Sequence, residues 1–225
     1  MEFSEHSYFY DMDSELREHL AKSVERNVAE VEALEVPVFV TTPDLLMHYP
    51  GAQWLPLTVD TVSWRNREPA FHHSGRPRVL HRPAAQGAKT KGSEYIMPVL
   101  EEMERAGRVE LVRAGPVDHA GMKQLIFRAD IVVDQLQAGA YGVTAVEAMA
   151  AGRLVIADIS DHTRSITGET LPVVSATPRT FREVLNKILD NRESAARIAA
   201  DGSAYVEYAH GGGRTAEVLA DFLRS

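Results

Sequence analysis

The sequence predicts an α/β fold in which a parallel β-sheet carries helices on both faces. From about residue 78 onward, short apolar runs alternate with stretches of helical periodicity, a pattern typical of strands linked by crossover helices. Two of these runs, Ile131–Val133 and Leu154–Ala157, are apolar at every position, as expected for strands covered on both sides. With 225 residues, of which 44% are hydrophobic, the chain can form a packed core of one or two domains.

The first part of the chain predicts an amphipathic helix and two short extended pieces ahead of the sheet. The helix is indicated by apolar residues at every third or fourth position, namely Leu16, Leu20, Val24, Val28, Val31 and Leu34. A β-branched strand is expected over Val36–Thr41, and Thr42-Pro43-Asp44 has the residues of a helix start. Gln53–Val59 predicts a second extended piece, and the polar tract Ser63–Arg76 predicts a linker.

The rest of the chain predicts five strands in alternation with helices. The strands are expected over Val79–His81, Val109–Ala114, Asp130–Leu136, Leu154–Ala157 and Leu171–Val174. The helices are expected from Ser93 to Ala106, after a capping Asp118, from Val143 to Ala151, after Thr177-Pro178, from Ser194 to Tyr208 and from Thr215 to Leu223. Pro98 lies inside the first of these helices and is expected to kink or delay it.

The stretch from Asp134 to Asp158 is the centre of this pattern. It joins two buried strands through a turn that contains Gly139 and Gly142, followed by a short helix. A strand, a turn and a helix in this order point free backbone N–H groups at an anion. Glu147 is an acid within an otherwise apolar part of that helix, which makes a simple exposed position less plausible than a specific role.

Within this stretch, AGAYGVTAVEAMAAGRLVIA resembles the donor-site signature of retaining, sucrose-synthase-like GT-B glycosyltransferases, E-G-F-G-x-x-x-x-E-A-M-A-x-G-x-P-V-I-A. The resemblance implies a Rossmann-like domain that binds a nucleotide-diphosphate sugar. It implies that Glu147 holds the ribose, and that the donor contacts the turn and helix start formed by Tyr141, Gly142, Val143 and Thr144. The first glutamate of the signature contacts the donor sugar, and its position is Gly139 here.

Two cations are expected to complete this donor site. In the resembled family an arginine in a G-R pair and a lysine in a K-G pair bind the diphosphate, and this chain has His81-Arg82 and Lys91-Gly92. Two cations and a helix N-terminus can neutralise a diphosphate without a metal, so no cofactor is expected besides the nucleotide sugar. Val117 is the residue expected near the base.

The resemblance also suggests a division of the chain. Residues 1–62 are expected to be the remnant of an acceptor-type domain plus a linker, and residues 63–225 the nucleotide-sugar-binding domain. The expected function is transfer of a glycosyl group from the nucleotide sugar to an unknown acceptor. The alternative is a non-catalytic nucleotide-sugar-binding module or a partner-dependent half-enzyme. In that case the apolar face of the N-terminal helix would pair with a second copy or with another protein.

Composition narrows the remaining possibilities. The net charge of −8 argues against general binding of nucleic acid, and the absence of cysteine excludes disulfides and thiolate metal sites. No apolar run reaches membrane-spanning length and no signal peptide is visible, which predicts a cytoplasmic protein. Asp11 and Asp13 form a D-x-D that could hold a metal-bound nucleotide, although helix capping is the simpler interpretation. A metal site made from the adjacent His72 and His73 alone is not expected.

A dinucleotide-binding site is a competing interpretation of the central stretch. Gly139 and Gly142 follow a strand, and Asp158 ends the next strand 19 residues after Gly139, which superficially suits that fingerprint. The fingerprint requires glycines where Tyr141 and Thr144 stand, however, and it normally opens the fold rather than occurring late in the chain. Binding of a nicotinamide cofactor would favour this alternative.

Overall fold

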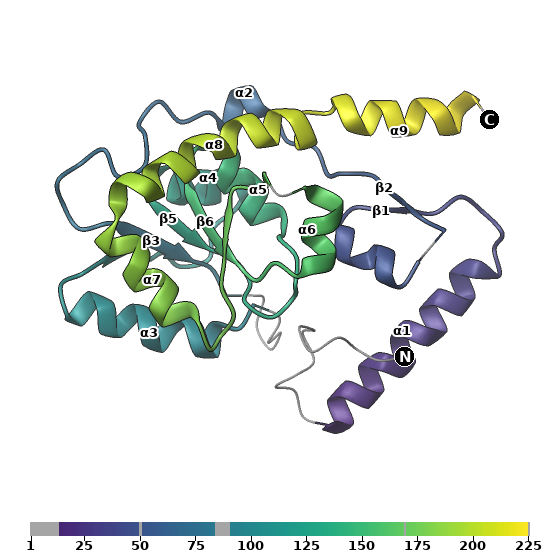
Figure 1. Ribbon diagram of the computed structural model, residues 1–225, viewed down its shortest axis with the longest axis horizontal. Helices are drawn as coiled ribbons and strands as arrows, with labels where there is room; N and C mark the ends of the chain where they lie inside the picture. Colours follow the sequence, from purple (N-terminus) through teal and green to yellow (C-terminus); the bar gives the residue numbers. More distant parts are fainter. Residues whose placement is uncertain (1–13, 50, 84–90, 169, 225) are drawn as a thin grey trace.

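The structure, a computed structural model, describes residues 14–49, 51–83, 91–168 and 170–224 (Figure 1). Its main feature is a five-stranded, wholly parallel sheet in the order β4-β3-β5-β6-β7. The strands are β3 (Arg78–His81), β4 (Glu110–Leu111), β5 (Ile131–Val133), β6 (Leu154–Ala157) and β7 (Val173–Ser175). The predicted fold class, a Rossmann-like α/β sheet, is therefore confirmed. The D-x-D at Asp11 and Asp13 lies outside the described residues.

Helices cover both faces of this sheet because successive strand residues point to opposite sides and both sides are apolar. One core contains Leu80, Val132 and Val155 together with side chains of α4 (His119–Arg128), α5 (Val143–Ala150) and the second half of α8 (Arg192–His210). The other core contains Val79, Ile131 and Leu154 together with side chains of α3 (Ser93–Arg105), α7 (Phe181–Asp190) and the first half of α8. Helix α8 thus contributes to both cores.

Most of the predicted elements from residue 78 onward occur, with shifted boundaries. Asp118 caps α4 as predicted, because its Oδ1 accepts a hydrogen bond from the N–H of Gly121 at 2.8 Å. Helix α7 begins at Phe181 rather than just after Pro178, because Thr177 and Thr180 bond each other in a separate turn. Helix α3 continues through Pro98.

Helix α8 is longer than the sequence predicted and includes Gly202. A side chain at Gly202 would approach the backbone O of Met149 to 3.0 Å, so the glycine lets α8 lie close against α5. Helix α8 ends at His210, two residues after the predicted end at Tyr208, and α9 (Gly213–Arg224) follows it.

The N-terminal segment begins with α1 (Ser14–Glu32). After it, β1 (Phe39–Val40), the 3₁₀ helix η1 (Pro43–Met47) and β2 (Gln53–Trp54) contact one another and form a small N-terminal unit. The strands pair in parallel with each other and do not join the main sheet. Both are shorter than predicted. Figure 1 shows α1 standing away from the five-stranded sheet.

The last two helices tie this N-terminal unit to the rest of the chain. The backbone O of His210 accepts a hydrogen bond from Val59 N–H at 3.0 Å, and Thr215 Oγ1 donates to the backbone O of Pro56 at 2.7 Å. The guanidinium of Arg214 lies 4.6 Å from the ring centre of Trp54, a cation–π contact. Residues 53–59 are therefore held against α8 and α9.

The prediction of a linker over residues 63–76 needs correction. Trp64 ends the short helix α2 (Thr61–Trp64) and is buried in the same core as α4 and α5. Asn66 Nδ2 donates to the backbone O of Phe127 at 2.9 Å, and Ala70 is buried in the other core. The few apolar residues within this tract anchor it to the sheet. The prediction missed them because it was based on the polar composition of the tract as a whole.

None of the helices in the described parts of the chain combines the length and the apolar character needed to cross a membrane.

Candidate functional site

The order of the strands indicates where a ligand would bind, namely at the carboxyl ends of β3 and its neighbours. Strand β3 lies between β4 and β5, so the chain leaves β3 toward one side and later crosses to the other. In open parallel sheets, ligands bind at such a reversal, outside the carboxyl ends of the strands. In this chain β3 ends with His81 and is followed by Arg82, and Asp134 follows β5.

Lys91 and Gly142 meet at the end of β5 through a buried carboxylate. Lys91 Nζ lies 2.8 Å from Asp134 Oδ1, and Gly142 N–H donates to Asp134 Oδ2 at 2.9 Å. Asp134 is 1% exposed, whereas the Lys91 side chain is 20% exposed. The backbone O of Lys91 also accepts a hydrogen bond from Leu136 N–H. The structure thus brings the predicted lysine and the predicted helix start together.

The turn before α5 depends on its two glycines for different reasons. Gly139 has φ of 64°, the left-handed region that side chains disfavour, and its N–H donates to Asp158 Oδ2 at 3.2 Å. Gly142 has an ordinary φ of −100°, but a Cβ there would lie 3.2 Å from Asp134 Oδ2. A glutamate at position 139 would therefore be strained in this backbone.

Glu147 is buried and paired with a histidine. Its Oε1 lies 2.8 Å from Nε2 of His119, the first residue of α4, and Glu147 is 5% exposed. The His119 side chain is 74% exposed and its ring packs edge-on against Trp64. Glu147 is therefore part of a specific pair next to solvent at the start of α4, rather than a free surface acid.

His81 occupies the position of the glycine in the G-R pair of the resembled family, and its role here is internal. Its Nδ1–H donates to the backbone O of Val133 at 2.8 Å, so Nε2 accepts from Ser93 Oγ, also at 2.8 Å. Burial lowers the pKa of His81, which keeps the imidazole neutral. His81 thereby joins the ends of β3 and β5 to the start of α3.

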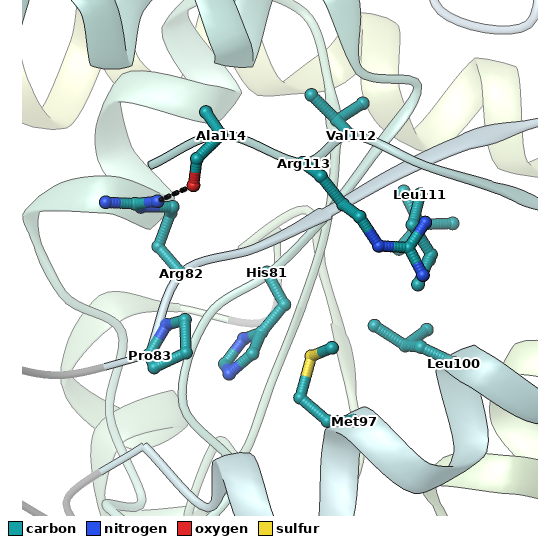
Figure 2. A pocket seen from close by; sticks show the side chains of 10 residues that line it. His81, Arg82, Pro83, Met97, Leu100, Leu111, Val112, Arg113 and Ala114 are labelled. Atoms are coloured by element: carbon teal, nitrogen blue, oxygen red, sulfur yellow. Dashed lines mark hydrogen bonds between the residues drawn. The ribbon is translucent and has the colours of Figure 1, made fainter. Parts of the chain in front are cut away.

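Arg82 points toward Ala114, in the segment that follows β4, as Figure 2 shows. Its Nη1 donates to the backbone O of Ala114 at 3.0 Å and to that of Gly115 at 3.2 Å. It borders a pocket of about 310 Å³ between the ends of β3 and β4 and helix α3. Met97 and Leu100 of α3 form part of its apolar lining (Figure 2).

Arg113, on the other side of this pocket, is held in place by Glu104 of α3. Its two terminal nitrogens lie 2.7 and 2.6 Å from the two carboxylate oxygens of Glu104. The hydrogen bonds from Arg113 lower the pKa of Glu104 to about 2, so this pair stays ionised at neutral pH.

The other predicted site residues lie in different surroundings. The Tyr141 side chain is 2% exposed, and its hydroxyl lies 3.2 Å from the Tyr205 hydroxyl and 3.1 Å from His210 Nε2. Burial raises the pKa of Tyr141. Val143 is 55% exposed and begins α5, while Thr144 is half-buried beside it. Only the backbone of Tyr141 therefore faces the turn, because its side chain belongs to the core.

Val117 lies in the connection between β4 and α4. It is 39% exposed and does not line the pocket, and its side chain packs against the backbone of Gly121.

Sequence reasoning missed two members of this edge, Asp134 and His119. A signal existed for Asp134, because it is an acid placed directly after the apolar run Ile131–Val133. No comparable signal existed for His119, which lies 28 residues before Glu147 and meets it only through the fold. In the described part of the chain, no group of three or more acidic or histidine side chains is arranged to hold a metal ion.

No protein-family model matches the sequence, and no curated protein matches it significantly. Solved structures do match. Anabaena HepE, solved in complex with UDP-glucose, is 14% identical with a TM-score of 0.61, over 84% of this chain and 63% of that one. Sucrose-phosphate synthase from Thermosynechococcus elongatus is 17% identical with a TM-score of 0.60, over 97% of this chain and 63% of that one.

The catalytic domain of Arabidopsis thaliana Starch Synthase IV, bound to ADP and acarbose, is 13% identical with a TM-score of 0.55, over 79% and 50% of the two chains. The chain spans less than two thirds of the length of these structures, and at such identities the likeness is one of fold. The neighbours are GT-B glycosyltransferases. The chain has the Rossmann-like α/β fold of a GT-B glycosyltransferase domain.

Proposed function

We propose that the chain binds a nucleotide-diphosphate sugar at the carboxyl ends of β3 and β5 and serves in the transfer of its glycosyl group to an acceptor. One observation carries the proposal. A lysine and the glycine-led start of an eight-residue helix meet at the carboxyl end of β5, next to the point where the strand order reverses, and the same helix carries a buried glutamate. HepE and Starch Synthase IV, which share the fold, have structures with UDP-glucose and with ADP, respectively.

The diphosphate would lie between Lys91 and the first turn of α5. The N–H groups of Val143 and Thr144 belong to the first helical turn and have no acceptor within the helix. Together with the helix dipole they favour an anion there. Lys91 supplies a charge on a flexible stem, and Arg82 has guanidinium N–H groups beyond the one bonded to Ala114 and Gly115.

The nucleoside would lie further along the same edge. Oε1 of Glu147 is bonded to His119, and Oε2 would accept a ribose hydroxyl. The pocket beside Arg82 has apolar walls and backbone carbonyls on its rim, which suits a flat base. Val117 follows that pocket along the chain and would lie near its entrance.

Whether the bound sugar is transferred depends on groups beyond this edge. The left-handed backbone at Gly139 disfavours the glutamate that grips the donor sugar in the resembled family. Residues 1–62 are proposed as part of an acceptor-type domain, and residues 63–225 as the donor domain. The alternative is a module that binds the nucleotide sugar without turning it over, or one that needs a partner subunit. The Gly139 backbone is the observation that favours it.

A dinucleotide site finds less support. Asp158, which would have to hold a ribose, accepts the N–H of Gly139. Tyr141 stands where a glycine is needed, and its side chain fills the core against Tyr205 and His210.

Calorimetric titration with a panel of nucleoside diphosphates and nucleotide sugars tests the proposal. At least one is expected to bind, equally well with and without EDTA. Glu147→Gln should weaken binding of that nucleotide about tenfold, the value of a lost hydrogen bond to a charged group, and leave pyrophosphate within about twofold. Equal losses for both ligands would exclude the ribose role of Glu147.

A pair of lysine variants provides the matched control. Lys91→Met should weaken both the nucleotide and pyrophosphate, whereas Lys187→Met, at an exposed ion pair with Glu183 on α7, should weaken neither. Incubation with labelled donor sugars and a broad acceptor set then separates transfer from binding alone. If no nucleotide binds, the proposed function is wrong.

A further inference from the structure

Asp134 is a buried acid within the cationic part of the candidate site, and the proposed function assigns it no role. One of its oxygens lies 2.8 Å from Lys91 Nζ and the other accepts Gly142 N–H at 2.9 Å. These are the lysine and the helix start proposed to receive a diphosphate. Asp134 thus offsets the positive charge of Lys91 before any ligand arrives.

The turn itself has other attachments that do not involve Lys91. Gln135 Nε2 donates to the backbone O of Ala140 at 2.6 Å, Asp158 N–H donates to the backbone O of Gln135 at 2.8 Å, and Gly139 N–H donates to Asp158. The contact between Lys91 and Asp134 is therefore additional to what holds the turn. An internal carboxylate at this place has an electrostatic consequence for any anion that approaches it.

The two forms of the proposed ligand differ in charge at the end that faces this carboxylate. In a nucleotide sugar both phosphates are esterified and carry one charge each, so the diphosphate has a charge of about −2. A free nucleoside diphosphate has an unesterified terminal phosphate with a second pKa of about 6, so it carries about one more negative charge at neutral pH. A fixed negative charge nearby therefore weakens binding of the free nucleoside diphosphate more than binding of the nucleotide sugar.

We propose that Asp134 is a specificity-determining residue that makes the site prefer the nucleotide sugar over the free nucleoside diphosphate. The inference rests on the proposed function and deepens it. By offsetting Lys91, Asp134 lowers the affinity for the more highly charged diphosphate. In a transferase this would ease release of the nucleoside diphosphate that remains after the sugar has left.

Asp134→Asn is the direct test, because the amide keeps the size of the side chain and its oxygen can still accept Gly142 N–H. Calorimetric titration should show that the free diphosphate binds about tenfold more tightly to the variant, and the matching nucleotide sugar no more than about threefold more tightly. In a Lys91→Met background both ligands bind more weakly. In that background, Asp134→Asn should still strengthen binding of the free diphosphate more than binding of the nucleotide sugar. The reason is that in Lys91→Met alone the Asp134 carboxylate repels the ligand with no lysine beside it.

A measurement on the unmodified protein keeps the inference testable if the variant does not fold. The preference for the nucleotide sugar, measured as its affinity divided by that of the free nucleoside diphosphate, should decrease as the pH falls through about 6. Protonation of the terminal phosphate then gives both ligands the same charge. The protein groups around that phosphate are Lys91, Arg82, Asp134 and the neutral His81. His119 and Glu147 would face the ribose that both ligands share, so they cancel in the ratio.

The outcomes separate the two proposals. If both ligands bind but Asp134→Asn weakens them together, Asp134 only positions Lys91 and the inference is wrong. An unchanged affinity ratio in the variant, or a ratio independent of pH in the unmodified protein, also overturns it while leaving the proposed function intact. If neither ligand binds either protein, the proposed function fails and the inference fails with it.

Discussion

Strand β5 is flanked by two aspartates that are equally buried and differ in their partners. Asp130 precedes the strand and is 0% exposed, and Asp134 follows it and is 1% exposed. Asp130 accepts hydrogen bonds from the N–H groups of Phe71 at 2.9 Å and Arg78 at 2.7 Å, and it lies 3.0 Å from His73 Nε2. Its partners come from the tract that leads into β3.

The two ends of the strand therefore have different tasks. At the amino end, backbone groups and a histidine satisfy the carboxylate and fasten residues 71–78 to the sheet, which stabilises the fold. At the carboxyl end, the partners of Asp134 are a lysine and a helix start, groups that also suit an external anion. Two equally buried residues of the same type thus have different partners, and our proposal assigns ligand selection only to the one at the carboxyl end.

Arg153 reinforces the amino end of the sheet. Its fully buried guanidinium donates to the backbone O atoms of Ala129 and Glu68, and its Nε donates to that of Ala151. Burial lowers the pKa of Arg153 to about 10, which still leaves it charged at neutral pH. The Arg153 side chain thus joins the segments that contain Glu68, Ala129 and Ala151.

The largest expected effect is on stability at the amino end. Asp130→Asn should lower the free energy of unfolding by about 3 kcal/mol, because it removes the charge from a buried cluster of donors. Asp134→Asn should cost only about 1 kcal/mol, since its oxygen can still accept Gly142 N–H. Urea unfolding measures both. Asp190→Asn, at an exposed ion pair with Arg108, is the control and should change stability by less than about 1 kcal/mol. A larger loss for Asp134→Asn than for Asp130→Asn would reverse the comparison.

The contribution of Asp130 should depend on pH in a defined direction. Burial alone would raise the pKa of Asp130. Hydrogen bonds from the N–H groups of Arg78 and Phe71, together with the charges of Arg78 and His73, outweigh that influence, so the pKa lies below the ordinary 3.8. The stabilisation is then fully present above the unfolded-state value and is lost as the pH falls through the lower folded-state value.

Unfolding of the wild type and of Asp130→Asn at a series of acidic pH values tests this direction. The difference between them should be constant well above pH 3.8 and should shrink below it. A difference that grows on acidification would mean that the carboxylate is not stabilised in its charged form.

A small effect, confined to stability, is expected for Tyr141. Tyr141→Phe should cost about 1 kcal/mol of stability, because the hydroxyl lies within hydrogen-bonding distance of Tyr205 and His210. Nucleotide affinity should stay within about twofold of the wild type, since the side chain faces the core. A large loss of affinity without a loss of stability would instead place the tyrosine hydroxyl at the ligand.

The sequence predicted the central unit best because its signals are local. The strands on either side of α5, the start of that helix at Val143 and the cap at Asp118 follow from neighbouring residues. Lys91 and Gly142 were predicted as site residues, and the structure brings them together through Asp134.

The parts that could not be predicted depend on distant contacts. The partner of Glu147 is 28 residues away, and the partners of Tyr141 are 64 and 69 residues away. The polar tract that was predicted as a linker is fixed by bonds to Phe127 and Asp130, which are about 60 positions further along the chain. Composition and periodicity depend on neighbouring residues, so they do not predict hydrogen bonds between residues that are far apart in the sequence.

The most direct test of the proposed binding site is an NMR titration of the ¹⁵N-labelled protein with a nucleoside diphosphate that binds. We expect the amide signals of Gly142, Val143 and Thr144 to shift together with that of Lys91, while those of Phe71 and Arg78, at the opposite end of the sheet, stay in place. Saturating shifts centred on Phe71 and Arg78, with Gly142 and Lys91 unaffected, would contradict it.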